Sequence, residues 1–507
     1  MTDTSKPSIY VSHIEMGIGD RRPTQAPLRI AEVQPNACDG LIGITFAPGK
    51  KQPDGATGAH DRDLSADLDV IAVWNAAIVV TLIEDHEIRA LQIDGLGAEV
   101  ERRFMEWRHW PIRDYSTPDA AFEAAWPVRS AQLRRLLASG ARVLVHCKGG
   151  LGRAGMIAAR LLVDCGDAPA DAIRKVRAVR AACAIETPEQ EDWVAQGRLQ
   201  STSAPAAADR ESCLNRAMGA LVGLAVGDAV GTTIEFAQKP DEPILLDMIG
   251  GGPFRLKAGE WTDDTAMAIA LAHSLVAHPD VDPADLMDRF TAWHEVGAYA
   301  CQGRCIDIGN TVQTALRRYR RDGNPLAGPT GDESSGNGAL MRQAPVMIRH
   351  WRSRARMRQV VEIQTRTTHR SEATRKASRI FAEMVADAIG GASLVTILRS
   401  EAATDIDGAW RDQPRSAIRG SGYVVHSLQA AVWAVARTTN FRSAILLAAN
   451  LGEDADTTAA IAGQLAGAIY GLKGIPREWL DRLAWRGDIE ELAVTLFDAG
   501  WADSSTA

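Results

Sequence analysis

The chain has 507 residues, of which 46% are hydrophobic, so it can bury more than one core and is long for one typical domain. Its formal net charge of −8 argues against nonspecific nucleic-acid binding but leaves room for a local basic pocket that takes a phosphorylated small molecule. Seven scattered cysteines without a CxxC pair predict neither a zinc site nor a disulfide framework, and they favour a reducing compartment.

The segment MTDTSKPSIYVSHIEMG lacks the charged and then apolar pattern of a secretory signal. The chain also has no run of about 18 uninterrupted apolar residues, which a membrane-spanning helix requires. We therefore expect a cytoplasmic protein without a membrane partner.

Short apolar runs alternate with helical patterns in the first part of the chain. The runs that predict strands are 41–47, 76–83 and 141–147, and the segments that predict helices are 120–140 and 155–166. This alternation is typical of helices packed on a parallel sheet, so we expect an α/β domain over residues 1–200.

A compositional break follows at residues 201–211, STSAPAAADRE, which are small and polar and predict an exposed linker. Beyond it, residues 212–507 carry few strand-like runs. Helical periodicity rich in alanine, leucine and glycine dominates there, for example over 265–278, 427–438 and 457–471. We expect an all-α domain whose small residues allow close helix packing.

The first chemical motif is LVHCKGGLGRAG, residues 144–155, between a predicted buried strand and a predicted helix. Backbone N–H groups of such a loop can converge on an anion at the helix N-terminus, where a thiolate at Cys147 is also favoured and Arg153 can clamp two phosphoryl oxygens. Such a loop needs backbone conformations that only glycine adopts readily, and Gly149, Gly150 and Gly152 would supply them. A lone cysteine is more often a small buried hydrophobe, but the Cys and Arg that frame this glycine loop favour a phosphate site.

This loop resembles that of the Cys-x5-Arg dual-specificity and tyrosine phosphatases, in particular the group with an HCxGGLGR sequence. The resemblance implies that Cys147 attacks phosphorus to form a phosphocysteine, that Arg153 binds the phosphoryl group, and that His146 supports the thiolate in the substrate-binding loop. In WRHWPIRDYSTPD it selects Asp114 as the general acid, with Asp119 as the less favoured substitute.

The phosphatase resemblance covers residues 40–195 and also nominates Gln190, in AIETPEQEDWV, to orient the hydrolytic water. The residues alone predict a surface helix there, with Thr187 as its N-cap. One departure is Ala154, because the family usually has Ser or Thr after the arginine, where the hydroxyl helps to expel the cysteine thiolate. The domain is therefore either a slow phosphatase or a phosphate-recognition module.

The second part of the chain holds three acidic clusters. They comprise Asp228 with Glu235; Thr262, Asp263 and Asp264; and Asp454, Asp456 and Thr457. The last two clusters precede apolar helices, so each by itself could simply cap a helix. Together they would concentrate hard oxygen ligands, the set that suits Mg²⁺ and a two-metal site.

Several motifs in order resemble the ADP-ribosylglycohydrolase family over residues 213–500, namely GLAVGDAVGTTIEF, WTDDT, GNGALMRQAPV, GYVVHSLQAAVWA and GEDADTTAAIAGQLAGAIYG. The resemblance implies an all-α fold with a binuclear Mg²⁺ site in a cleft. The implied metal ligands are Thr262, Asp263, Asp264, Asp454, Asp456 and Thr457. Glu235 would act as acid or base near the scissile bond, Asn337 and Gly338 would contact ADP-ribose, and Tyr423 would line the nucleotide pocket. We set aside His369, because a lone histidine is more often a packing residue.

The sequence thus predicts a bifunctional cytoplasmic hydrolase. One half would use Mg²⁺ to cleave the N- or O-glycosidic bond of an ADP-ribosylated protein or small molecule, and the other would hydrolyse a phosphomonoester of a phosphorylated substrate. One alternative is an ADP-ribosyl hydrolase with an N-terminal phosphate-recognition module. Another is that both sites act in turn on one phosphorylated ADP-ribose derivative.

Overall fold

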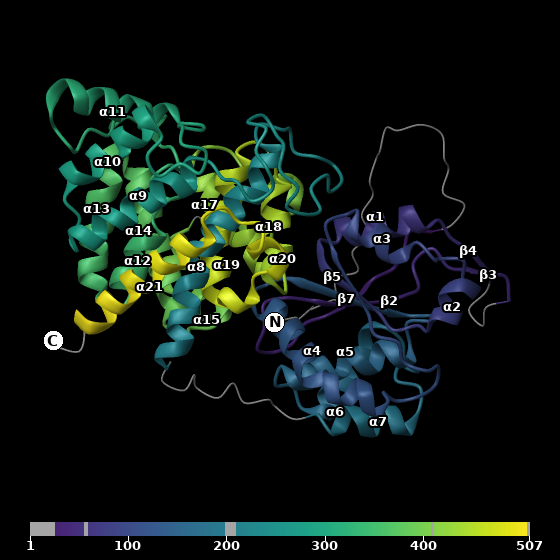
Figure 1. The fold of residues 1–507 in the computed structure, drawn as a ribbon. Helices are drawn as coiled ribbons and strands as arrows, with labels where there is room; N and C mark the ends of the chain where they lie inside the picture. The colour runs from purple at the N-terminus through teal and green to yellow at the C-terminus, as the bar shows by residue number, and fades with distance from the viewer. Residues whose placement is uncertain (1–25, 55–58, 198–208, 407–409, 504–507) are drawn as a thin grey trace, which may run out of the picture. The chain divides into compact units, whose positions relative to one another are not determined.

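The computed structural model describes residues 26–54, 59–197, 209–406 and 410–503. The chain divides into two compact units, Met1–Ser201 and Thr202–Ala507. The first is an α/β unit and the second is helical (Figure 1). The predicted fold class is confirmed for both halves of the chain. The predicted linker, 201–211, lies mostly outside the described residues.

The α/β unit is built on a five-stranded sheet in the order β1-β2-β7-β5-β6. The strands are β1 (Ala31–Val33), β2 (Ile42–Phe46), β5 (Ala76–Thr81), β6 (Glu106–His109) and β7 (Arg142–Cys147), and a separate pair is formed by β3 (Lys51–Gln52) and β4 (His60–Asp61). The three predicted strands are β2, β5 and β7. The sheet is parallel except at β1, which pairs with β2 in antiparallel orientation at the edge.

Helices cover both faces of this sheet. On one face lie α1 (Leu64–Val73) and α3 (Leu96–Glu101), and on the other lie α4 (Ala120–Ala138), α5 (Gly152–Asp164), α6 (Pro169–Val179) and α7 (Pro188–Ala195) (Figure 1). The short helix α2 (Asp85–Ala90) follows β5. Because β7 is covered on both faces, its sequence is a continuous buried run without alternation. It delivers Cys147 to the carboxyl end of the sheet, just before α5.

The helical unit is organised around α8 (Arg210–Gly231) and α19 (Ala455–Tyr470). Glycines at every fourth residue line their contact: Gly219, Gly223 and Gly227 on α8 face Gly467, Gly463 and Ala459 on α19. A Cβ atom at Gly227 would lie 2.2 Å from the carbonyl oxygen of Ala459, so the backbones are as close as glycine allows. This antiparallel contact brings the acidic end of α8 beside the start of α19.

The other helices surround this pair. They are α9 (Asp263–Ala277), α10 (Pro283–Val296), α11 (Asn310–Asp322), α12 (Ala344–His350), α13 (Arg354–Thr368), α14 (Glu372–Ile389), α15 (Leu394–Leu398), α16 (Glu401–Thr404), α17 (Val424–Ala436), α18 (Phe441–Ala449), α20 (Arg477–Leu480) and α21 (Arg486–Asp503). One helical stretch in the described chain, Arg210–Ile234, is apolar and long enough to cross a membrane by composition. Of its 18 most apolar consecutive residues, 83% are buried inside the unit, as expected of a helix in the core.

Two candidate active sites

The loop between β7 and α5 turns its carbonyl groups outward. The Lys148 carbonyl accepts a hydrogen bond from the Lys50 ammonium at 3.5 Å, and the Gly149 and Gly150 carbonyls accept from the Arg180 guanidinium at 3.0 and 2.8 Å. Because the C=O and N–H of a peptide group point in opposite directions, the N–H groups that follow these carbonyls point inward.

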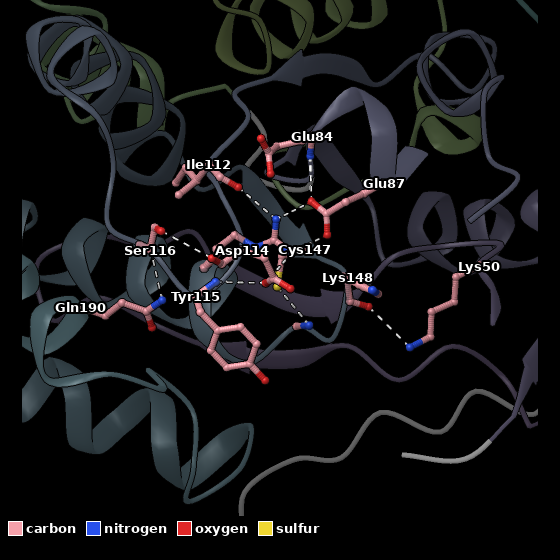
Figure 2. Close-up of polar contacts among 12 residues, drawn as sticks. Lys50, Glu84, Glu87, Ile112, Asp114, Tyr115, Ser116, Cys147, Lys148 and Gln190 are labelled. Carbon is pink, nitrogen blue, oxygen red and sulfur yellow. Dashed lines mark hydrogen bonds and ion pairs between the residues drawn. The ribbon is translucent and has the colours of Figure 1, made fainter. Parts of the chain in front are cut away.

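One of these inward N–H groups, that of Gly150, donates to the Cys147 sulfur at 3.1 Å (Figure 2). Gly150 has a φ of +70°, and a Cβ atom there would lie 2.4 Å from the Thr45 carbonyl oxygen, so the turn requires glycine. The loop is therefore a cradle for negative charge around the buried thiol.

Arg153 closes the cradle from the first turn of α5. Its guanidinium is held by both oxygens of Glu87 at 2.6 and 2.9 Å, and it also donates to the Ile112 carbonyl at 3.0 Å. An ion pair with Asp114 at 2.9 Å completes the shell. Burial alone would lower the pKa of Arg153, but the Glu87 hydrogen bonds and the surrounding negative charges raise it above its ordinary value. Arg153 therefore stays charged inside the protein.

The two candidate general acids differ in what they already bind. Asp119 is the N-cap of α4 and accepts a hydrogen bond from the Phe122 N–H at 2.7 Å. Asp114 lies in the loop before α4, 45% exposed, with its carboxylate on the guanidinium of Arg153. Asp114 is thus placed at the cradle, whereas Asp119 stabilises a helix.

Gln190 lies beside the same loop, fully buried on α7. Its side chain donates to the Ser116 carbonyl at 3.3 Å (Figure 2). It also accepts from the Glu186 N–H at 2.9 Å. Thr187 forms the N-cap of α7, as the sequence predicts. These contacts tie the segment that carries Asp114 to α7.

Two other residues near the loop are enclosed by the sheet and α5. The ring of His146 is fully buried and shares a 2.8 Å hydrogen bond with the Thr81 hydroxyl, while burial lowers its pKa to about 4. It is therefore a neutral residue of the sheet interior and not a surface contact for substrate. Ala154 is also fully buried, so no hydroxyl is present at that position.

In the helical unit, the start of α9 is capped from another helix. Thr262 occupies the N-cap position but its side chain makes no capping hydrogen bond. Asp228 on α8 instead accepts from the backbone N–H groups of Thr262 and Thr265, each at 3.0 Å, and from both hydroxyls at 2.8 and 2.6 Å. The first two carboxylates of α9, Asp263 and Asp264, are therefore not used as caps.

The start of α19 is also capped by a carboxylate from another segment. Asp454 is the N-cap residue without a side-chain capping bond, and Glu235 accepts from the N–H groups of Ala455 and Asp456 at 2.7 and 3.1 Å. The simple capping interpretation is wrong for Asp454, as it is for the Thr262 side chain. Asp228 and Glu235 come from outside these helices and accept from their first N–H groups. The carboxylates at the helix starts are therefore left to face one another.

Two carboxylate triads result, Asp228 with Asp264 and Asp456, and Glu235 with Asp454 and Asp456. In each triad one oxygen atom per residue lies within 4.8 Å of the others. Asp456 belongs to both. The Thr262 hydroxyl donates to Asp456 at 3.2 Å, and the hydroxyls of Thr262 and Thr457 each lie 3.5 Å from Asp264. The fold brings together all of the predicted ligand set except Asp263, which lies beside it at the start of α9.

The charge of this cluster fits a hard divalent cation. One oxygen of Asp264 is buried with no hydrogen-bond partner in the described chain. Burial and mutual repulsion raise the pKa values of Asp263, Asp264 and Asp456 well above the ordinary range, so the carboxylates are costly to hold together by themselves. An oxygen-only donor set with a free buried lone pair is suited to a cation such as Mg²⁺. Asp228 accepts hydrogen bonds from Thr262 and Thr265, so it fixes the start of α9 and thereby positions the cluster.

A cavity of about 680 Å³ opens above these carboxylates. Its wall includes the predicted residues Glu235, Asp263, Asn337, Gly338, Tyr423, Asp454 and Thr457. Asn337 donates to Asp454 at 2.9 Å, and a β-bridge joins Gly336 to Tyr423, so two distant segments meet at one wall. His369, which we set aside from the sequence, and Asp307, which we did not single out, also line this cavity.

Comparison with known proteins assigns both halves. A family model described as ADP-ribosylglycohydrolase matches residues 209–505, and one described as the DSP-PTPase phosphatase of a polymorphic toxin system matches residues 55–167. The chain belongs to the ADP-ribosylglycohydrolase family. It is 41% identical over 341 residues to ADP-ribosylarginine hydrolase Tri1 of Pseudomonas putida, which covers 66% of this chain and 85% of the relative.

Two other family relatives support the assignment. ADP-ribosyl-[dinitrogen reductase] glycohydrolase of Rhodospirillum rubrum is 38% identical over 275 residues, 53% of this chain and 90% of the relative. A solved structure titled ADP-ribosylglycohydrolase-related protein complex is 37% identical with a TM-score of 0.51, covering 57% of this chain and 99% of that chain. Both resemblances stated from the sequence are confirmed. This ADP-ribosylglycohydrolase family member is a hydrolase with an N-terminal phosphatase-like domain.

The structure gives roles at the two sites to residues for which the sequence predicted no such role. In the phosphatase-like domain, Glu87 holds Arg153, and Lys50 and Arg180 hold the loop. In the ADP-ribosylglycohydrolase domain, Asp228 anchors the start of α9. Asp228 belongs to one of the acidic clusters visible in the sequence, but the other three carry no motif of these sites because their partners lie far away in the chain.

Proposed function

We propose that the chain is a bifunctional hydrolase. The helical unit would release ADP-ribose from ADP-ribosylated arginine by cleaving the N-glycosidic bond, and the α/β unit would hydrolyse a phosphomonoester through a phosphocysteine. The observation that carries the first activity is the oxygen-only cluster beneath a cavity that Asn337, Gly338 and Tyr423 line. The names of the Pseudomonas putida and Rhodospirillum rubrum relatives support an ADP-ribosylated substrate.

The residues that would hold two Mg²⁺ ions are Thr262, Asp263, Asp264, Asp454, Asp456 and Thr457, as proposed from the sequence. When bound, such ions supply electrostatic stabilisation and orient ribose hydroxyls and a water molecule toward the anomeric carbon. Asp228 and Glu235 keep the ligands in place by satisfying the N–H groups of α9 and α19.

Glu235 is the residue proposed to exchange a proton near the scissile bond. Burial and the neighbouring Asp454 carboxylate raise its pKa, so the group lies in the range where it can serve as acid or base near neutral pH. It lines the cavity and is fixed by two backbone hydrogen bonds, which holds the carboxyl group in one orientation.

The charge of the cavity wall favours arginine over serine as the severed partner. Asp307, Asp332 and Glu333 line the cavity in addition to the proposed metal-binding set, while Glu453 in the same wall already pairs with Arg419 at 3.1 Å. A cationic guanidinium finds complementary charge there, whereas a neutral serine hydroxyl finds none. We therefore propose an arginine-linked substrate.

In the phosphatase-like domain, the Cys147 thiolate would attack phosphorus while the inward N–H groups of the loop and Arg153 hold the phosphoryl oxygens. Asp114 would protonate the leaving oxygen, and Gln190 would orient the water that hydrolyses the phosphocysteine. The cradle around Cys147, with the charged and fixed Arg153, supports this assignment.

A phosphate-recognition module is the second candidate for this domain, and Ala154 is the observation that favours it. Turnover of p-nitrophenyl phosphate separates the two. A phosphatase loses turnover on Cys147→Ser, whereas a binding module shows none before the substitution and still binds phosphate after it.

The seven cysteines are free thiols in both units, which agrees with the proposed cytoplasmic location.

The first experiment is release of free ADP-ribose from arginine- and serine-modified proteins, with Mg²⁺ or EDTA. We expect release from arginine only, in Mg²⁺ only, and its loss in Asp263→Asn and Asp456→Asn. Release from serine-modified protein alone would overturn the proposed linkage. Activity that survives EDTA and both substitutions would overturn the metal site. A phosphorylated ADP-ribose derivative, supplied to wild type and Cys147→Ser, tests whether the two sites share a substrate.

A further inference from the structure

Lys50 is a buried cation next to the phosphate loop. The residue is only 3% exposed, and its ammonium lies 4.8 Å from the centre of the Phe46 ring. Within the described residues the ammonium makes one hydrogen bond, to the Lys148 carbonyl at 3.5 Å. Figure 2 shows its side chain reaching the Lys148 carbonyl, next to Cys147. A lysine is rarely buried without a nearby negative charge, so we expect an anionic group beside this ammonium.

The groups that surround Lys50 point to Cys147 as that partner. Arg180, Lys148 and Arg62 are cations, and Asp67 on α1 is engaged by Arg62 at 2.6 and 2.8 Å. On the β3–β4 side lies His60, itself next to Arg62. Phe46, over which the ammonium lies, is the register partner of Cys147 between β2 and β7, and Lys148 directly follows Cys147, so Lys50 lies at the part of the loop that holds the thiol. Burial and these cations lower the pKa of Lys50 to about 8, and the charge of Cys147 acts in the opposite direction.

The same loop lacks a hydroxyl where one is expected. Ala154 is fully buried, and the recorded hydrogen bond of the Cys147 sulfur comes from the Gly150 N–H. Loss of the phosphoryl group from Cys147 leaves a negative sulfur, which needs stabilisation in a buried site. A fixed ammonium can supply it through charge alone.

We infer that Lys50 is the cationic partner of the Cys147 thiolate and compensates for the missing hydroxyl at position 154. This inference rests on the proposed phosphatase activity. In the second step, water forms the new P–O bond and gives its proton to the Asp114 carboxylate. The P–S bond breaks, and its electron pair returns to sulfur as the thiolate. Lys50 keeps its proton throughout and acts as a positioning residue through its charge.

The test uses the full chain and measures alkylation of Cys147 by iodoacetamide from pH 5 to 9, followed by mass spectrometry of that peptide. Lys50→Met removes the charge and keeps an apolar chain on Phe46. Lys51→Met is the matched control, because Lys51 is 45% exposed and pairs with Asp61 at the surface. We expect the alkylation midpoint to rise by about one pH unit or more in Lys50→Met and not in Lys51→Met. Lys50→Arg should restore part of the shift.

A second measurement follows phosphocysteine breakdown after rapid mixing with p-nitrophenyl phosphate. Lys50→Met should accumulate the intermediate, and adding Ala154→Ser to that variant should speed its breakdown about tenfold. Equal alkylation midpoints for the two methionine variants, with thermal unfolding showing both folded, would overturn the inference. A midpoint shift without turnover in any variant would instead overturn the phosphatase proposal and the role in release, while the charge pairing would stand.

Discussion

In the loop before α5 an inward backbone N–H group meets a thiol, whereas at the starts of α9 and α19 the N–H groups meet carboxylates from other segments. In the first case the loop leaves its inward N–H groups uncovered and Arg153 lies beside them, an arrangement that suits an anion. In the second case Asp228 and Glu235 occupy the helix ends, and the remaining carboxylates form the cluster that we propose to hold a cation. Backbone N–H groups thus suit opposite charges in the two units, depending on whether a carboxylate already covers them.

The largest expected effects separate the two sites by substitution. Cys147→Ser should lower phosphomonoester turnover roughly 10⁴-fold or more, because the nucleophile is lost, and leave ADP-ribose release intact. Asp264→Asn should lower ADP-ribose release more than about 100-fold, because it removes the charge of a buried ligand, and leave phosphatase turnover intact. Both products are measured by chromatography.

The control for that comparison is Asp322→Asn, since Asp322 is exposed at the end of α11 and pairs with Arg321. It should change neither rate. If Cys147→Ser also abolished ADP-ribose release, the two sites would not be independent.

A smaller effect should distinguish the two acids of the phosphatase-like domain. Asp114→Asn should reduce turnover about 100-fold and abolish the alkaline limb of the pH–rate profile, because a general acid must be protonated to donate its proton. Asp119→Asn should leave turnover unchanged, because asparagine also caps a helix, while Asp119→Ala should cost about 1 kcal/mol of stability through the lost bond to Phe122. Steady-state kinetics and urea unfolding check the three variants. The reverse pattern of turnover would make Asp119 the general acid.

The smallest effect is on stability and tests the charge of the acidic cluster. The folded-state pKa of Glu235 is raised from 4.5 to about 8, and those of Asp263, Asp264 and Asp456 are raised as well. The folded state therefore holds protons that the unfolded state loses, so in EDTA the helical unit should become less stable as pH rises from 4.5 to about 8. Excess Mg²⁺ should reverse this slope, because cation binding requires ionised ligands. Thermal unfolding that is independent of pH in EDTA would contradict the assignment.

Much of this molecule could be predicted from short segments. The apolar runs placed β2, β5 and β7, and HCKGGLGR identified a cradle because the cysteine, glycines and arginine that build it are neighbours in the chain. The contacts of Glu87 could not be predicted, since its local sequence indicates only a capping box at the start of α2. Its pairing with Arg153 joins positions 66 residues apart, and no repeating pattern in the sequence indicates that these two residues are in contact.

The sequence by itself determined the two units, the α/β and all-α classes, and the motifs from which both sites are built. These features depend on local spacing, which sets which residues share a strand, a turn or a helix end. Only the tertiary structure decided what each charged group does. It showed that Asp119 caps a helix while Asp114 reaches Arg153, that Asp228 and Glu235 free the other carboxylates, and that Lys50 lies against the phosphate loop. The physical reason is that charge and hydrogen bonding act through space, between residues that the fold alone brings together.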